Sequence, residues 1–354
     1  MQSQKNYKRI VVKIGSSLFC SKAGKLDTAM LSNIAGQVSS LLKEGKEIVL
    51  VSSGAIALGM SVLKLTDRPK ELSFLQAAAA VGQNELMDVY RDFFKERGIN
   101  CAQLLLTWED FSDRKRYLNA KNTLNTLLKL NSVPIINEND TVSTDEIKFG
   151  DNDRLSALVS ILVGADLLII LSDVEGLWDE NKKIIRVVDK ITGTVKSLAS
   201  ASKKKTSVGG MVTKLEAAAV VVNSGIPCVI ASGHKKDVIK LLAEDIGSNG
   251  TLFLSGDKML GAKKRWIAFG TKSKGKIIVD DGAKRALLNK NSLLSVGIVS
   301  CSGNFSSGDV VSICNNDDVE FARGKTGLTV RELEKIKGTR FTKEIIHRDN
   351  IVIL

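Results

Sequence analysis

The sequence is poor in residues that titrate near neutral pH or form crosslinks. Its two histidines, His234 and His347, stand far apart without metal-ligand spacing, so a mechanism based on a histidine base is not indicated. The five cysteines are scattered and form neither a CxxC pair nor a Cys/His cluster. We therefore expect no zinc site and no disulfide framework, and a reducing cytoplasm fits this cysteine usage best.

Long apolar runs are also missing. The longest, around residues 167–171, has the length of a strand and not of a membrane span. The first ten residues, MQSQKNYKRI, lack the apolar core of a signal peptide. The sequence thus predicts a cytoplasmic protein that makes no use of a membrane.

The size and charge of the chain indicate its class and the kind of partner that it could bind. Its 354 residues exceed one typical core, and the hydrophobic (44%) and charged (25%) fractions are those of a globular protein. More than half of the net charge of +12 lies in residues 256–354. This excess fits an anionic partner, either a nucleotide or RNA, and it equally fits a solvated surface. Against RNA, Phe305, Phe321 and Phe341 are isolated and offer no stacking platform.

Runs of strand length alternate with runs of helical apolar spacing through most of the chain. Strands are expected at 8–14, 48–51, 99–106, 133–136, 166–171 and 227–230, and helices at 31–44, 72–81, 84–97, 119–130, 155–162 and 215–222. This alternation predicts an α/β fold with a mainly parallel open sheet sandwiched by helices.

The pattern changes after residue 255. Residues 256–275 are basic and glycine-rich and are interpreted as a linker or a connecting strand. Short apolar runs from residue 276 to 354 predict a small β-rich domain with one helix near 283–288. We therefore expect one domain at 1–255, a linker at 256–275 and a second domain at 276–354.

Small and polar residues follow five of the expected strands. They are Gly15-Ser16-Ser17, Ser52-Ser53-Gly54, Asn137-Glu138-Asn139-Asp140, Ser172-Asp173 and Ala231-Ser232-Gly233. Because the carboxyl ends of parallel strands meet at one edge of a sheet, these residues predict a composite ligand site. Near its end, the loop after Asn137 carries a second polar group, Gly150-Asp151-Asn152-Asp153. Helix caps and turns would explain one such cluster, but two clusters around one loop favour a site.

Six motifs together resemble the glutamate 5-kinase family of the amino acid kinase superfamily. They are KIGSSL at 13–18, SSGAIALG at 52–59, INEND at 136–140, FGDNDRLSALV at 149–159, LSDVEGLW at 171–178 and GGMVTKLEAA at 209–218. INEND together with GDND distinguishes this family from the kinases of acetylglutamate, aspartate and uridylate. The later segment DDGAKRALLNKNSLLSVGI…GNFSSGDVVSI resembles the PUA domain that many members carry.

The resemblance implies that ATP phosphorylates the side-chain carboxylate of L-glutamate, giving L-glutamyl 5-phosphate in the first step of proline biosynthesis. The attacking carboxylate is already ionised at neutral pH and needs no general base, which fits the scarcity of histidine. Mg²⁺ is expected on the nucleotide, with no protein ligand named. Proline is expected to inhibit at the glutamate site or a site overlapping it, and we expect a homo-oligomer.

The same resemblance assigns the site residues. Lys13 and Lys214 would act on the transferring phosphoryl group, and Asp153 would hold both lysines by charge-assisted hydrogen bonds. Glutamate would be bound by Ser53, Asp140 and Asn152, with Asn137 as a neighbour. The expected ATP-binding residues are Lys13, Gly15, Ser172, Asp173, Val208, Gly209, Gly210, Met211, Val212, Thr213 and Lys214. The family usually has threonine where this chain has Val208, so one ATP contact is in question.

Two alternatives remain open at this point. One is a kinase of another small acid on the same fold, and the other is an RNA-binding protein that acts through the PUA domain. The acceptor-side motifs INEND and GDND favour glutamate over the first alternative.

Overall fold

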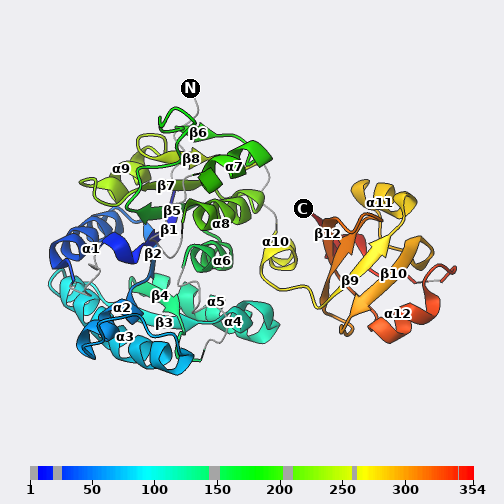
Figure 1. Cartoon of the computed structure of the whole chain (residues 1–354), viewed down its shortest axis with the longest axis horizontal. Coiled ribbons are helices and arrows are strands. Elements are labelled where there is room, and N and C mark those ends of the chain that lie inside the picture. The colour runs from blue at the N-terminus through cyan, green and yellow to red at the C-terminus, as the bar shows by residue number, and fades with distance from the viewer. Residues whose placement is uncertain (1–6, 19–25, 143–151, 202–209, 257–260, 342) are drawn as a thin grey trace. The chain divides into compact units, whose positions relative to one another are not determined.

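A computed structural model gives the structure of the chain and describes residues 7–18, 26–142, 152–201, 210–256, 261–341 and 343–354 (Figure 1). The chain divides into two compact units. The first comprises Met1–Asp110 and Arg114–Met259, and the second comprises Phe111–Asp113 and Leu260–Leu354. Within the described ranges, no helix is long and apolar enough to cross a membrane.

An eight-stranded sheet forms the centre of the first unit, in the order β3-β4-β2-β1-β5-β7-β8-β6. Its strands are β1 (Arg9–Ile14), β2 (Glu47–Ser52), β3 (Cys101–Leu106), β4 (Val133–Glu138), β5 (Leu167–Ser172), β6 (Val187–Val188), β7 (Cys228–Ser232) and β8 (Thr251–Phe253). Every described pairing is parallel except that of β7 with β8. Strands buried on both faces, as a parallel sheet requires, explain the continuous apolar runs in the sequence.

Helices cover both faces of this sheet (Figure 1). They are α1 (Thr28–Lys43), α2 (Ala55–Val62), α3 (Leu72–Lys95), α4 (Trp108–Ser112), α5 (Arg114–Lys129), α6 (Asp153–Val163), α7 (Gly193–Ala201), α8 (Met211–Asn223) and α9 (Val238–Glu244). Alternate residues of β1 separate the two sides: Ile10, Val12 and Ile14 join the core formed with α1, α3 and α9. Lys13 lies between Val12 and Ile14 and therefore points to the opposite face, where α6 packs against α8.

The mainly parallel sheet with helices confirms the fold class predicted from the alternation. Two elements differ from their expected bounds. The strand expected at 133–136 continues through Asn137 and Glu138, because these residues pair with Leu105 and Leu106 of β3 and pairing outweighs their weak strand propensity. The two helices expected at 72–81 and 84–97 are one helix, α3.

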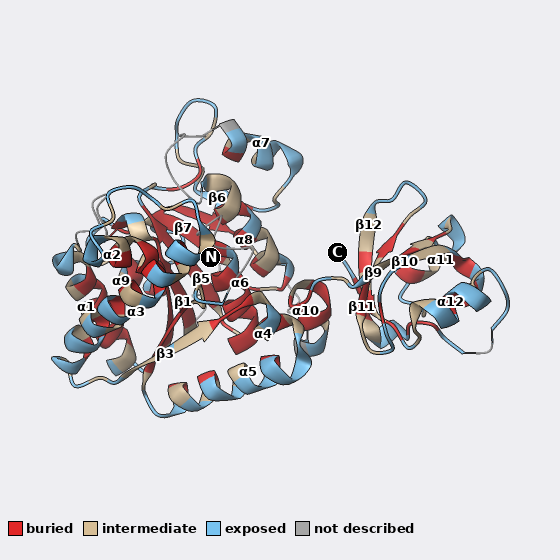
Figure 2. Cartoon of the chain, turned by 60° about the horizontal axis from the view of Figure 1, so that its bottom comes forward, coloured by how far each residue is buried: buried red, intermediate tan, exposed pale blue. Residues whose placement is uncertain are grey.

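A five-stranded sheet, in the order β10-β9-β11-β12-β13, forms the second unit with its own apolar core (Figure 2). Its strands are β9 (Gly275–Val279), β10 (Ile298–Gly303), β11 (Val310–Cys314), β12 (Glu320–Lys325) and β13 (Ile351–Ile353). Its helices are α10 (Ala262–Phe269), α11 (Asp281–Leu288) and α12 (Val330–Ile336). Only β9 and β11 pair in parallel among the described pairings of this sheet.

The expected helix near 283–288 is α11. The second unit has two further helices, α12 and α10, that the sequence analysis did not expect. The first, α12, begins at a capping box in which Thr329 and Glu332 bond to each other's backbone N–H. The T-x-x-E spacing in the sequence therefore indicated the start of a helix, but the short apolar runs around it favoured strands. The second, α10, occupies part of the segment interpreted as a linker or connecting strand. Its flanking glycines, Gly261 and Gly270, stand at its two caps.

Candidate active site

Five strands end side by side at one edge of the first unit's sheet, because β4, β2, β1, β5 and β7 are parallel neighbours. Backbone hydrogen bonds tie the segments that follow them. Gly15 N donates to Leu171 O at 3.1 Å, and Gly233 N donates to Ser172 O at 2.9 Å. The polar residues that the sequence places after these strands therefore meet along a single edge.

Asp153 lies at the centre of this edge as the first residue of α6, with its side chain fully buried. Its Oδ1 lies 2.5 Å from Lys13 Nζ, and its Oδ2 lies 3.2 Å from Lys214 Nζ. Thr213 Oγ1 also donates to Asp153 Oδ2, at 3.1 Å. The structure thus brings together the two lysines and the aspartate that the sequence singled out.

Three secondary structure elements position this cluster. Lys13 reaches it from the end of β1, and Lys214 reaches it from the first turn of α8, which packs against α6. Both lysines are buried, with 4% and 5% of their surface exposed. Burying a charge costs several kcal/mol unless it is paired, so the shared carboxylate is what allows two ammonium groups inside the protein.

Three charged side chains meet in this cluster. Two ammonium groups surround one carboxylate, so the three side chains carry one net positive charge. Gly15 lies beside them and leaves room that a side chain would fill, since a Cβ there would lie 3.9 Å from Lys13 Nζ and 3.3 Å from Leu171 O. Two buried ammonium groups next to a glycine turn suit an anionic group such as a phosphoryl group.

Side-chain amides form a second cluster next to the first. Asn152 Nδ2 donates to Asn137 Oδ1 at 2.6 Å and also to the backbone carbonyl of Ser52. Asn137 Nδ2 donates in turn to Gln83 Oε1 at 2.7 Å. All three amide side chains are buried. Asn152 is adjacent to Asp153 in the chain, so the amide cluster and the lysine cluster share one anchor at the start of α6.

The remaining acceptor-side residues lie at the same edge. Ser53 is buried directly after β2, and Gly54 follows in the left-handed conformation, with φ of 102°, at the start of α2. Asp140 is half-buried two residues after β4. Residues 143–151, which include Asp151, lie outside the described residues.

The nucleotide-side residues are divided between described and undescribed segments. Ser172 is buried at the end of β5, and its Oγ donates to Asp173 Oδ1 at 3.0 Å. Gly210 is exposed and precedes α8, whose first turn contains Met211, Val212 and Thr213, all half-buried. Val208 and Gly209 lie outside the described residues, so the contact questioned at Val208 stays a prediction.

Sequence reasoning missed the support that α3 gives to this site. Gln83 and Tyr90 are both buried on that helix, and Tyr90 Oη lies 3.0 Å from Ser52 Oγ. Burial raises the pKa of Tyr90 well above its ordinary value, so its hydroxyl stays neutral. A glutamine among the apolar residues of the AAAAVGQ run was the available signal, because a polar side chain on a buried helix face requires a partner.

The nearby thiol of Cys228 is not a nucleophile candidate. The residue is fully buried on β7, and burial, followed by the negative charge of Asp153, raises its pKa well above the ordinary value. A thiol that keeps its proton is a poor nucleophile. The reactive capacity of this edge therefore lies with its ammonium, amide and hydroxyl groups.

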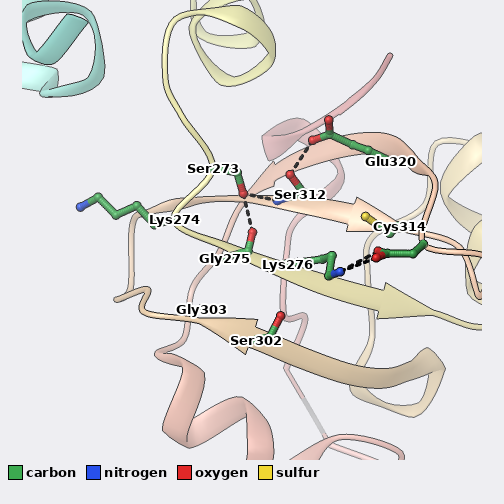
Figure 3. A pocket seen from close by; sticks show the side chains of 10 residues that line it. Ser273, Lys274, Gly275, Lys276, Ser302, Gly303, Ser312, Cys314 and Glu320 are labelled. Carbon is green, nitrogen blue, oxygen red and sulfur yellow. Dashed lines mark hydrogen bonds and ion pairs between the residues drawn. The ribbon is translucent and has the colours of Figure 1, made fainter. Parts of the chain in front are cut away.

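A hollow in the second unit provides a contrast. Its volume is about 370 Å³, and it is lined by residues of β9, β10, β11 and β12 (Figure 3). Its charged side chains form ion pairs: Lys276 pairs with Asp318 at 2.7 Å, Lys274 with Asp309 at 2.9 Å, and Glu320 with Arg323 at 2.9 Å. The two lysines of this hollow are also more exposed, at 60% and 35% of their side-chain surface, than Lys13 and Lys214, at 5% and 7%.

Comparison with known proteins agrees with the fold. Residues 8–232 match the model of the amino acid kinase family, and residues 275–348 match that of the PUA domain. The chain therefore belongs to the amino acid kinase family and carries a PUA domain.

Within the amino acid kinase family, the relatives that match almost the whole chain are glutamate 5-kinases. The chain is 43% identical over 364 residues to the glutamate 5-kinase of Thermoanaerobacter sp. (strain X514), with 98% of each chain covered. It is 44% identical over 368 residues to the glutamate 5-kinase of Nitrosospira multiformis (strain ATCC 25196 / NCIMB 11849 / C 71), with 99% of each covered. The resemblance found in the six sequence motifs is thus confirmed.

Proposed function

We propose that this chain transfers the γ-phosphoryl group of ATP to the side-chain carboxylate of L-glutamate and forms L-glutamyl 5-phosphate, the first step of proline biosynthesis. The observation that carries the proposal is the buried cluster of Lys13, Lys214 and Asp153 at the edge of the sheet. The full-length similarity to proteins named glutamate 5-kinase supports glutamate as the acceptor.

The cluster suits a reaction that needs charge stabilisation and no base. During phosphoryl transfer, negative charge spreads over the oxygens of the transferring group. Lys13 and Lys214 would lie against this charge, and Asp153 would hold both ammonium groups in place before the substrate arrives. Because the acceptor carboxylate is already ionised, none of the three residues has to remove a proton.

The acceptor would bind on the amide side of the cluster. Asp140 would pair with the substrate ammonium, and Ser53 would donate to a substrate carboxylate. Asn152 uses both of its N–H bonds within the protein, so it can offer the ligand only its oxygen, Oδ1. Asn137 holds this arrangement in place from the end of β4.

The nucleotide would bind on the other side of the lysines. Gly15, Ser172, Asp173 and the segment 208–214 would contact ATP, with backbone N–H groups near its phosphates. The described residues include no group of three or more His, Cys, Asp or Glu side chains that could hold a metal ion, so we name no protein ligand for Mg²⁺. When bound with the nucleotide, Mg²⁺ would offset part of the phosphate charge.

The proposal also covers inhibition by proline, the location in the cell and the oligomeric state. Proline shares its α-carboxylate and ammonium with glutamate, so we propose that it inhibits at the glutamate site or a site overlapping it. We further propose that the protein works in the cytoplasm as a homo-oligomer. Proline inhibition that stays unchanged as glutamate is raised to saturation would count against an overlapping site.

The test is the release of ADP by the purified protein in a coupled assay with ATP and Mg²⁺. We expect release that depends on L-glutamate and is absent with N-acetylglutamate, whose blocked nitrogen carries no charge for Asp140. Equal rates with the two acids would remove the assignment of Asp140. Release with a different small acid, and none with glutamate, would make the chain a kinase of that acid.

A further inference from the structure

We propose that Gln83 is a positioning residue that decides which end of the Asn152 amide faces the acceptor substrate. Gln83 lies on α3, and only 8% of its surface is exposed. Its link to the site is one hydrogen bond, from Asn137 Nδ2 to Gln83 Oε1 at 2.7 Å. This inference rests on the proposed function, because it takes the amide cluster as the place where the acceptor binds.

The first step concerns the two hydrogens of Asn152 Nδ2. One is donated to Asn137 Oδ1 at 2.6 Å, and the other to the backbone carbonyl of Ser52. A primary amide has only two N–H bonds to give. Asn152 Oδ1 makes no hydrogen bond with the described part of the chain. The amide therefore presents an acceptor to a ligand, and an acceptor selects a donor such as an ammonium group.

The second step concerns the orientation of Asn137. Its Oδ1 accepts from Asn152 Nδ2 and from the backbone N–H of Glu138 at 2.9 Å, while its Nδ2 donates to Gln83. If the amide of Asn137 turned over, its NH₂ would face the NH₂ of Asn152, and its oxygen would face Gln83 Oε1. Both contacts would be repulsive. An acceptor at position 83 thus keeps the oxygen of Asn137 directed at Asn152.

The third step concerns what holds Gln83. The preceding residue, Gly82, lies so close to α2 that a Cβ there would be 1.8 Å from Ala55 O, and a Cβ at Gly59 would be 1.7 Å from Ala78 O. The backbones of α2 and α3 are therefore in direct contact, which fixes the depth at which α3 inserts Gln83. A shift of this helix would carry Gln83 with it.

A second residue on the same helix supports the same arrangement. Tyr90, two helical turns after Gln83, contacts Ser52 Oγ at 3.0 Å. Ser52 also supplies the carbonyl that accepts from Asn152. The helix α3 thus holds both residues that accept hydrogen bonds from Asn152 Nδ2, which are Asn137 and Ser52. Removing one acceptor from such a buried network leaves a buried donor without a partner.

The consequence is a specific kind of substrate selection. Without an acceptor at position 83, Asn137 Nδ2 is a buried donor without its partner, and the present orientation of Asn137 rests on Glu138 N–H and Asn152 alone. If Asn137 turns, Asn152 Nδ2 keeps only the Ser52 carbonyl, so Asn152 turns more readily to present NH₂ to the ligand. That arrangement no longer favours the ammonium group of glutamate. ATP binding involves other groups, so the KM for ATP should not change.

The test compares three variants of the full-length protein with the wild type. Gln83→Met keeps the length of the side chain and removes the acceptor, and Gln83→Glu keeps an oxygen at the acceptor position. The matched control is Gln37→Met. Gln37 is a buried glutamine on α1 whose Oε1 accepts from Ile239 N at 2.8 Å, within the same unit and remote in sequence from the site motifs.

The readouts are the KM for L-glutamate, the KM for ATP, and the ratio of kcat/KM for glutamate to that for glutarate, which lacks the amino group. For Gln83→Met we expect the glutamate KM to rise and the ratio to fall, each by about tenfold, while the ATP KM stays within about twofold. Gln83→Glu should restore most of both values. Gln37→Met should leave both unchanged, even where it lowers the melting temperature.

The outcomes separate this inference from the proposed function. A wild type that releases no ADP with glutamate contradicts the proposed function itself. An active wild type with an unchanged glutamate-to-glutarate ratio in Gln83→Met overturns the role of Gln83, as does an equal loss in Gln37→Met. If Gln83→Met does not fold, Gln83→Asn takes its place, because it withdraws the acceptor by one methylene and stays polar.

Discussion

Asp153 Oδ1 lies 2.5 Å from Lys13 Nζ, and neither side chain is appreciably exposed to solvent. The second oxygen of the same carboxylate contacts Lys214. One buried carboxylate therefore positions two ammonium groups that come from distant parts of the chain. The arrangement explains how two ammonium groups can be held inside the protein, ready for an anionic transition state.

The lysines should act mainly on the chemical step. Replacing Lys13 or Lys214 by alanine should lower kcat by about 100-fold or more and change the glutamate KM by no more than about threefold, because the charge they meet is largest in the transition state. Steady-state kinetics would show this. Lys43, an exposed lysine at the end of α1, is the matched control. A change confined to KM would contradict the assigned role.

Asp153 should matter for stability as well as for catalysis. Asp153→Asn leaves two buried ammonium groups without their shared counter-charge, so we expect the free energy of unfolding to fall by about 3 kcal/mol. Urea denaturation would measure it. Asp92→Asn, at a side chain that is 67% exposed, should change the same quantity by less than about 0.5 kcal/mol. Equal effects of the two substitutions would mean that the buried charges are not held by Asp153.

A truncated first domain should keep its activity. All six kinase motifs end by residue 218, so a chain that ends after Ser255 should fold and turn over ATP with glutamate. The structure identifies one weak point. Phe111 is buried and groups with the second unit, where its carbonyl accepts from Trp266 Nε1 at 3.0 Å. The truncation would remove Trp266 and leave Phe111 uncovered.

We therefore expect Phe111→Gln to improve the solubility of the truncated chain. Size-exclusion chromatography would test this, and the coupled assay would then be run on the monodisperse fraction. A soluble, monodisperse truncation without glutamate-dependent turnover would show that the second unit completes the active site.

The thiol of Cys301 should be slow to react at neutral pH. Burial, together with the hydrogen bond from Sγ to Glu334 Oε1 at 3.0 Å, raises its pKa from 9.0 to about 12. Because the folded pKa lies above the unfolded value, the stability that this thiol contributes is complete below pH 9.0 and is lost as pH rises toward 12. Alkylation followed against pH, with peptide mapping, should show this high apparent pKa.

The matched variant for this thiol is Glu334→Gln, which removes the negative charge beside it. It should bring the apparent pKa of Cys301 closer to the ordinary value and speed alkylation at pH 9. Rapid alkylation of Cys301 at pH 7 in the unmodified protein would be inconsistent with the observed pairing.

The lysine cluster was accessible from sequence because motif positions and strand ends both pointed to it. Alternation along β1 directs Lys13 away from Ile14, and sheet order brings distant strand ends together. The glutamine in the AAAAVGQ run showed that a polar side chain of α3 needs a partner, but not which one. Nothing local in the sequence shows that Gln83 faces Asn137, since their contact depends on the depth at which α2 and α3 pack. The helix α10 was missed because its flanking glycines, which cap it, resembled those of a linker.

Detection of the phosphorylated product tests the central claim most directly. An acyl phosphate reacts with hydroxylamine, so the purified protein would be incubated with ATP, Mg²⁺, L-glutamate and hydroxylamine, and the hydroxamate and ADP would be measured together. We predict glutamyl 5-hydroxamate and ADP in equal amounts, with neither formed above background by Lys214→Ala. ADP formed without hydroxamate, or hydroxamate formed equally by that variant, would contradict the account.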